Sequence, residues 1–108
     1  MKTTITFKMM PDDLRLSAFI FDNAQLVELA QSNINRYTSV LVIDKVVDED
    51  EIKDGKFMAE ELFDLTNNPS REEECSLLWS GRSMCVGDIA RVDGVDWLCC
   101  SSGWIKVN

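Results

Sequence analysis

Histidine is absent from this sequence of 108 residues, and proline occurs only twice. Because histidine is the commonest general base and the commonest metal ligand, its absence excludes the ordinary catalytic triads. The longest apolar stretch lies around residues 40–43, far short of the roughly 18 apolar residues that a transmembrane helix needs. The N-terminus alternates polar and apolar side chains and lacks the continuous apolar segment of a signal peptide, so we expect a cytoplasmic protein.

Basic residues are also scarce: eleven stand against nineteen acidic residues, and the formal net charge is -8. Such a balance is unfavourable for direct binding to nucleic acid or to an anionic membrane surface. The hydrophobic fraction of 45% and the charged fraction of 28% are close to those of globular proteins. We expect residues 1–108 to form a single domain, because the chain is too short for a second core.

Four cysteines are present, Cys75, Cys85, Cys99 and Cys100, but their spacing does not suit one tetrahedral metal ion. Without an export signal we expect reduced, partly buried thiols, no structural disulfide, no bound metal and no cofactor. Cys99 and Cys100 are adjacent on an expected strand, so their side chains point to opposite faces. We expect one of them to be buried and the other to lie nearer solvent.

The N-terminal third is expected to contain two strands and a helix. Alternating Thr, Ile and Phe residues favour a strand over residues 3–9. The apolar run 16–21 is too short for its periodicity to separate helix from strand, and we interpret it as a second strand. A helix is expected to follow and to end at Asn33, with Asp22 or Asn23 as its N-cap.

The middle of the chain is expected to contain a strand, a helix and a loop. Residues 37–47 are rich in β-branched side chains, which favours a buried central strand. Apolar residues at helical spacing predict a helix over residues 56–66. Residues 71–82 are expected to form a loop or an irregular helical turn. Three apolar residues of this segment are expected to fold back onto the core: Leu77, Leu78 and Trp79.

The strongest local signal is Asp93-Gly94, which is typical of a two-residue type I′ turn. This turn joins two expected strands, 85–92 and 95–100, and residues 103–107 are expected to form a last short strand. Together these elements predict an α+β fold. We expect a small single domain in which an antiparallel sheet carries one or two packed helices and ends in a C-terminal β-hairpin.

The net charge is concentrated in one segment of the chain. Residues 44–74 contain twelve acidic and four basic residues, whereas the remainder is neutral. A dense acidic face can attract a basic partner, and the simpler alternative is a solvated face. The candidate partner-binding residues are Asp48, Glu49, Asp50, Glu51, Asp54, Glu60, Glu61 and Asp64.

Other kinds of site have less support from the sequence. Asp50 and Glu61 fall at positions one and twelve of an EF-hand loop, but Ile52 occupies position three, where an oxygen ligand belongs. No nucleophile has an activating base at a recognisable spacing, so we expect a protein without enzymatic activity. For Arg82-Ser83 and Gly87-Asp88 the sequence leaves two interpretations: a binding site, or a structural role in which Gly87 permits a bend and the Asp88 carboxylate accepts hydrogen bonds from nearby backbone amides.

Several short motifs of the second half recur in a known group of proteins. These motifs are Phe63-Asp64-Leu65-Thr66-Asn67-Asn68, Arg82-Ser83-Met84-Cys85-Val86-Gly87-Asp88, Asp93-Gly94, Trp97-Leu98-Cys99 and Gly103-Trp104. With them, residues 37–108 resemble a module of small accessory proteins of bacteriophages, plasmids and conjugative elements, including YodL-like and KfrB-like domains. Cys85 stands where a serine is more usual, and residues 1–36 have no counterpart. The resemblance implies a mobile-element origin, an α+β fold and a regulatory or host-interaction role.

Charge and resemblance together predict a non-enzymatic, acidic accessory protein of a phage or mobile element that acts by protein–protein interaction. Its expected partner is a host protein with a basic surface, for example the nucleic-acid site of a defence protein. The acidic surface would mimic nucleic acid at that site and so inhibit the protein. The alternative is a small-ligand or ion-binding module. Such a module would use the loop 50–61 or a pocket near the C-terminal hairpin.

Overall fold

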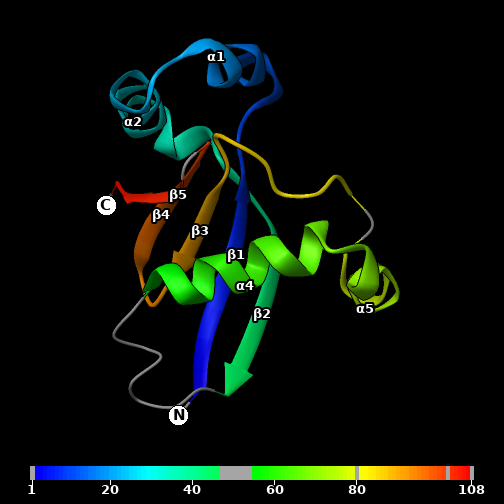
Figure 1. The fold of residues 1–108 in the computed structure, drawn as a ribbon. Helices are drawn as coiled ribbons and strands as arrows, with labels where there is room; N and C mark the ends of the chain where they lie inside the picture. Colours follow the sequence, from blue (N-terminus) through cyan, green and yellow to red (C-terminus); the bar gives the residue numbers. More distant parts are fainter. Residues whose placement is uncertain (1, 47–54, 80, 102, 108) are drawn as a thin grey trace.

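An antiparallel sheet in the order β2-β1-β3-β4-β5 forms the centre of the fold (Figure 1). The structure is a computed structural model that describes residues 2–46, 55–79, 81–101 and 103–107. The strands within these ranges are β1 (Lys2–Met9), β2 (Thr38–Val46), β3 (Ile89–Val92), β4 (Val95–Cys100) and β5 (Gly103–Lys106). The predicted α+β fold with an antiparallel sheet is confirmed.

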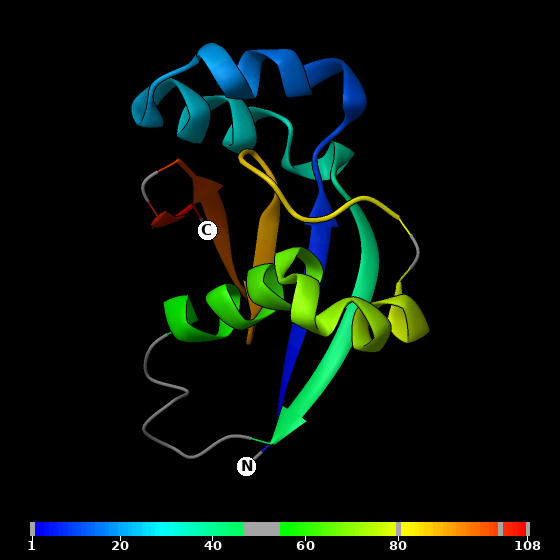
Figure 2. The same cartoon turned by 45° about the vertical axis from the view of Figure 1, so that its right-hand side comes forward.

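Helices lie on one face of the sheet and at one of its ends (Figures 1 and 2). The longest, α4, crosses the sheet face, and α5 follows it beside the outer edge of β2. The first two α-helices pack at the far end of the sheet. The α-helices are α1 (Arg15–Ile20), α2 (Asn23–Ser32), α4 (Gly55–Asn67) and α5 (Glu72–Leu78), and the 3-10 turns are η1 (Asp12–Leu14), η2 (Ile34–Arg36) and η3 (Pro69–Arg71).

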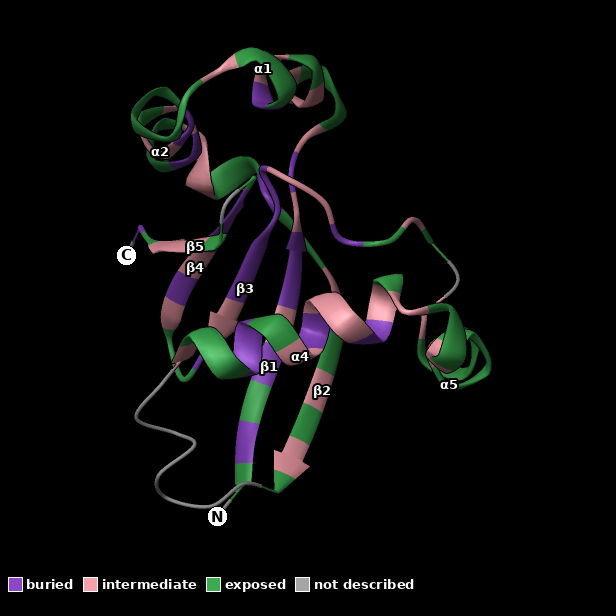
Figure 3. Cartoon of the chain, in the orientation of Figure 1, coloured by how far each residue is buried: buried purple, intermediate pink, exposed green. Residues whose placement is uncertain are grey.

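Two apolar clusters hold these layers together, and Figure 3 shows buried residues along β1, β3 and β4. In the first cluster, Met58 and Leu62 of α4 pack on the sheet against residues that include Phe7. In the second cluster, Leu26 of α2 packs with residues that include Leu98 of β4. Removing apolar surface from water on both sides of the strands stabilises the single domain.

Two elements form where local sequence signals predict them. Asp93 and Gly94 have φ values of 49° and 79°, the positive values that a type I′ turn requires, and they join β3 to β4. The side chain of Asp22 accepts a hydrogen bond from the Gln25 amide at 2.8 Å, while Gln25 accepts one from the Asp22 amide at 3.0 Å. This capping box starts α2 where the sequence places it.

Two segments differ from the sequence-based expectation. Residues 16–21 were predicted as a strand, and this is wrong: the turn η1 leads into α1, which buries Ala18 and exposes most of its other apolar side chains. Within residues 71–82, η3 leads into the regular helix α5 rather than into a loop or an irregular helical turn. Trp79 packs edge-on against Phe7, as expected, but Leu77 and Leu78 are exposed.

The strand over residues 38–46 is an edge strand, so the prediction of a buried central strand is wrong. It pairs with β1, and the register shifts between Phe7 and Lys8, which leaves Val40 as an extra residue.

β3 begins at Ile89 and not at residue 85, because a turn precedes it. Cys99 and Cys100 are both buried, since a packed layer covers each face of β4.

Candidate functional site

Acidic side chains gather on the outer side of α4 and at the start of α5. We call this surface the acidic corner, and it consists of Glu60, Glu61, Asp64, Glu72, Glu73 and Glu74. Among the salt bridges of the described residues, those of the acidic corner come from Lys45 of β2 and Arg71 of η3. The carboxylates outnumber the cations that pair with them, so the corner keeps a negative charge.

Arg71 joins the two helices of the acidic corner. Its guanidinium lies 2.9 Å from a carboxylate oxygen of Glu61, 2.9 Å from one of Asp64 and 3.0 Å from one of Glu74. Lys45 approaches Glu61 at 2.8 Å. Because the guanidinium of one arginine donates hydrogen bonds to three carboxylates, it fixes α5 against α4 and β2.

These ion pairs change the acidity of the corner. Hydrogen bonds from Arg71 hold the pKa values of Asp64 and Glu74 below their ordinary range. Partial burial alone would raise the pKa of Glu61, but hydrogen bonds from Lys45 and Arg71 outweigh it and lower that pKa. All three carboxyl groups are therefore ionised at neutral pH.

A local turn places Arg71 where it can reach back to α4. The backbone N–H of Asn68 bonds to the Asp64 carbonyl at 2.8 Å, and the Asn68 side chain accepts from the Ser70 amide at 2.9 Å. Pro69 then begins η3, because its fixed φ suits the first position of a helical turn. The chain reverses within a few residues, and Arg71 lies beside the helix that has just ended.

The remaining acids of the corner differ in their surroundings. Glu60 accepts a hydrogen bond from the indole N–H of Trp104 at 2.8 Å, and Trp104 packs edge-on against Phe63. Glu72 and Glu73 are exposed, and within the described ranges neither forms a salt bridge. They are consequently the carboxylates most available to a partner.

Of the predicted partner-binding residues, three lie on α4 and form half of the acidic corner: Glu60, Glu61 and Asp64. The other five lie outside the described residues: Asp48, Glu49, Asp50, Glu51 and Asp54. The candidate residues named from the sequence did not include Glu72, Glu73 and Glu74, which lie in a segment that was expected to be a loop or an irregular helical turn. Three consecutive acids shortly after a proline are typical of a helix N-terminus, and this pattern would have identified Glu72, Glu73 and Glu74.

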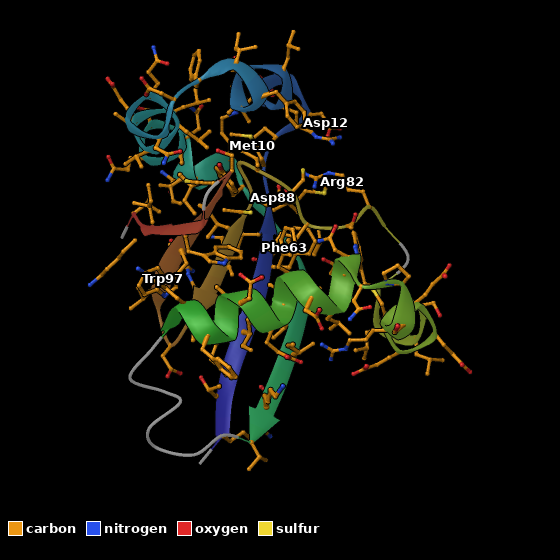
Figure 4. All side chains as sticks on the ribbon, in the orientation of Figure 1. Met10, Asp12, Phe63, Arg82, Asp88 and Trp97 are labelled. Atoms are coloured by element: carbon orange, nitrogen blue, oxygen red, sulfur yellow. The ribbon has the colours of Figure 1, made fainter. Side chains whose placement is uncertain are left out.

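A second polar cluster lies between the sheet and the helical end of the molecule (Figure 4). Asp88 is fully buried, and Arg82 contacts it with both terminal nitrogens, at 2.5 and 2.8 Å. The carboxylate also accepts from the backbone amides of Met10 and Cys85, at 2.8 and 2.9 Å. The expectation that Asp88 bonds to backbone amides is confirmed.

The Asp88 cluster has a structural role. Its four N–H donors satisfy the carboxylate, which therefore has little capacity left for a substrate. Burial and the neighbouring Asp88 raise the pKa of the Cys85 thiol, so that the thiol stays protonated and is a poor nucleophile at neutral pH. The cluster ties the end of β1 to the segment before β3.

The described residues contain no group of three or more His, Cys, Asp or Glu side chains arranged to hold a metal ion. Within the same ranges, no helix combines the length and the apolar character needed to cross a bilayer. Comparisons with protein families, with curated proteins and with solved structures found no match for this chain. The resemblance to YodL-like and KfrB-like modules therefore remains a prediction.

Proposed function

We propose that this chain is a non-enzymatic interaction protein whose acidic corner binds a partner protein with a basic surface. The observation that carries the proposal is the excess of carboxylates on α4 and α5, where Arg71 and Lys45 neutralise only part of the charge. Like charges this close repel one another, and a basic partner removes that cost on binding. The acids of residues 48–54 would extend the same charge along the chain.

The resemblance named above suggests the kind of partner. In an accessory protein of a phage or mobile element, an acidic surface that imitates nucleic acid would occupy the basic site of a host nucleic-acid-binding or defence protein. The Arg71 network supports this proposal, because it holds Glu61, Asp64 and Glu74 in fixed positions before a partner arrives. A rigid set of charges loses less entropy on binding than a mobile one does.

A small-ligand module is the second candidate. A surface cavity of about 500 Å³ lies between the C-terminal end of α4 and α5, and its lining includes Asn67, Glu72, Cys75 and Trp79. Its volume is within the usual range for small-molecule sites. A smaller cavity of about 190 Å³ lies beside the β4–β5 hairpin and includes Glu60 and Trp104.

The test of the main proposal is quantitative affinity capture with the full chain and with a double variant, Glu72→Lys with Glu73→Lys. Because both side chains are exposed, the variant is expected to fold normally. A true partner should be retained by the wild type, lost by the variant and released from the wild type between 50 and 300 mM salt, a range chosen because screening grows with ionic strength.

A matched control carries the same change of charge away from the acidic corner, in the variant Asp12→Lys with Glu28→Lys; both residues are exposed, on η1 and α2. This control should retain the partner. Equal retention by all three proteins, without salt dependence, would contradict the proposal. Recognition would then lie elsewhere on the molecule, for example around Trp79, Trp97 or Trp104.

A further inference from the structure

The outer edge of β2 has α5 beside part of it, but within the described part of the chain no strand pairs with it. Strand Thr38–Val46 pairs with β1 on one side, and no described strand pairs with the other side. Beyond the extra residue Val40, residues 41–46 form a regular stretch. An edge of this kind presents a row of unpaired N–H and C=O groups that can template another strand.

Exposed apolar side chains accompany this edge on both sides. The strand itself exposes 59% of Val42 and 79% of Val46. On the α4 side, Leu78 at the end of α5 is 52% exposed and lines a cavity of about 370 Å³ between β2, α4 and α5. Ile43 and Leu65 also line this cavity. The edge therefore offers a pocket for an apolar side chain next to open backbone groups.

Charge identifies the occupant. The cavity also contains Asp44, Glu61 and Glu74, and it adjoins the rest of the acidic corner. Its two cations, Lys45 and Arg71, already pair with carboxylates. A second copy of this chain would bring the same negative charge to the edge, whereas a basic segment would bring the complementary one.

We propose that β2 binds an extended basic segment of the partner as an added strand, so that the sheet continues into the partner. The backbone of the segment pairs with residues 41–46, one apolar side chain enters the cavity at Leu78, and lysine or arginine side chains on the same face approach Glu74 and Glu61. This inference rests on the proposed function and specifies how the basic partner is held. Main-chain bonds supply affinity, and the cavity with its carboxylates supplies specificity.

The test uses a defined probe, a nine-residue lysine–valine peptide with blocked ends, in which lysine and valine alternate at the odd positions and threonine fills the even positions, so that lysine and valine lie on the same face of the strand. A control peptide carries proline in place of the two central threonines; it keeps the lysines and valines but cannot form a continuous strand. Affinity is measured by fluorescence anisotropy, and amide hydrogen exchange locates the bound peptide. We expect at least tenfold weaker binding of the control peptide. We also expect increased protection at amides of β2 and none at β5, the opposite edge.

A pair of adjacent leucines tests the cavity. Leu78→Ser should lower the affinity for the lysine–valine peptide several-fold. Leu77→Ser changes an 84% exposed residue outside the cavity and should leave that affinity unchanged. Equal binding of both peptides would overturn strand addition but leave the acidic corner as a charged binding surface. Failure of both peptides to bind would also overturn it, and affinity capture would still decide the proposed function separately. If the free chain forms dimers that protect β2, the occupant is a second copy and the inference is wrong.

Discussion

Arg82 and Asp88 form a bidentate ion pair in which the aspartate carboxylate is completely buried while the arginine side chain keeps 21% of its exposure. The same carboxylate holds the amide of Met10 at 2.8 Å, so one buried group connects segments that are 78 residues apart in the sequence. A buried charge stays compatible with folding only while all of its partners are present.

Asp88→Asn should therefore strongly destabilise the fold. The substitution removes the charge that neutralises Arg82 and replaces one acceptor oxygen with a donor, and breaking a buried pair costs about 3–5 kcal/mol. Urea denaturation monitored by circular dichroism measures this loss. Asp44→Asn is the control, because Asp44 forms an exposed pair with Lys2 at 3.5 Å and should change stability little. Equal effects of the two substitutions would contradict the role assigned to Asp88.

The Arg71 network should make stability depend on pH in the acidic range. Glu61, Asp64 and Glu74 have folded-state pKa values below their unfolded ones, so their contribution is complete above the unfolded values, near about 4. It is lost as the pH falls through the lowered folded values. The melting temperature should thus decrease between about pH 5 and pH 2.

Replacing Arg71 with methionine should flatten this dependence, and melting curves recorded across the same pH range measure it. Arg36→Met is the matched control, because Arg36 lowers the pKa of the single carboxyl group of Asp13. Its effect on the slope should be smaller. A slope unchanged by Arg71→Met would show that the three carboxylates owe their ionisation to something other than this arginine.

The fold was predictable where local chemistry determines it and unpredictable where distant partners do. The turn at Asp93-Gly94 and the capping box at Asp22 depend on neighbouring residues, and both elements form as expected. The place of β2 at the sheet edge depends on which strands pair with β1, and the strand's own composition carries no such information. Residues 16–21 were wrongly predicted as a strand, because a short apolar run fits the periodicity of a helix as well as that of a strand.

The candidate site was predictable in its charge and not in its geometry. Counting acids located the negative segment, including Glu60, Glu61 and Asp64. The count does not show that Arg71 folds back over these helices, because that requires the turn at Asn68 and Pro69. The sequence also did not reveal that one edge of β2 lacks a paired strand, because that depends on which strands pair with β1.

The cysteines should react in an order set by burial. The structure has all four as free thiols, so reductant should leave the melting temperature unchanged. Burial raises the pKa of Cys99 to about 12 and also raises that of Cys100, whereas Cys75 is only partly buried. Because the thiolate is the reactive form, iodoacetamide at pH 8 should label Cys75 first and Cys99 and Cys100 only on unfolding. Peptide mass spectrometry measures the order, and early labelling of Cys99 would contradict the packing of β4.

Gly94→Val should destabilise the C-terminal hairpin through the backbone alone. Gly94 has a φ of 79°, and a Cβ added there would meet no atom within 4 Å, so steric clash with the rest of the molecule does not contribute. A β-branched residue at positive φ costs about 1–2 kcal/mol, which thermal melting detects readily in a domain of this size. Gly94→Asn is the control, because asparagine tolerates the left-handed region and should retain most of the stability. If valine and asparagine lowered the melting temperature equally, or if neither did, the turn would not have the type I′ conformation on which the pairing of β3 with β4 depends.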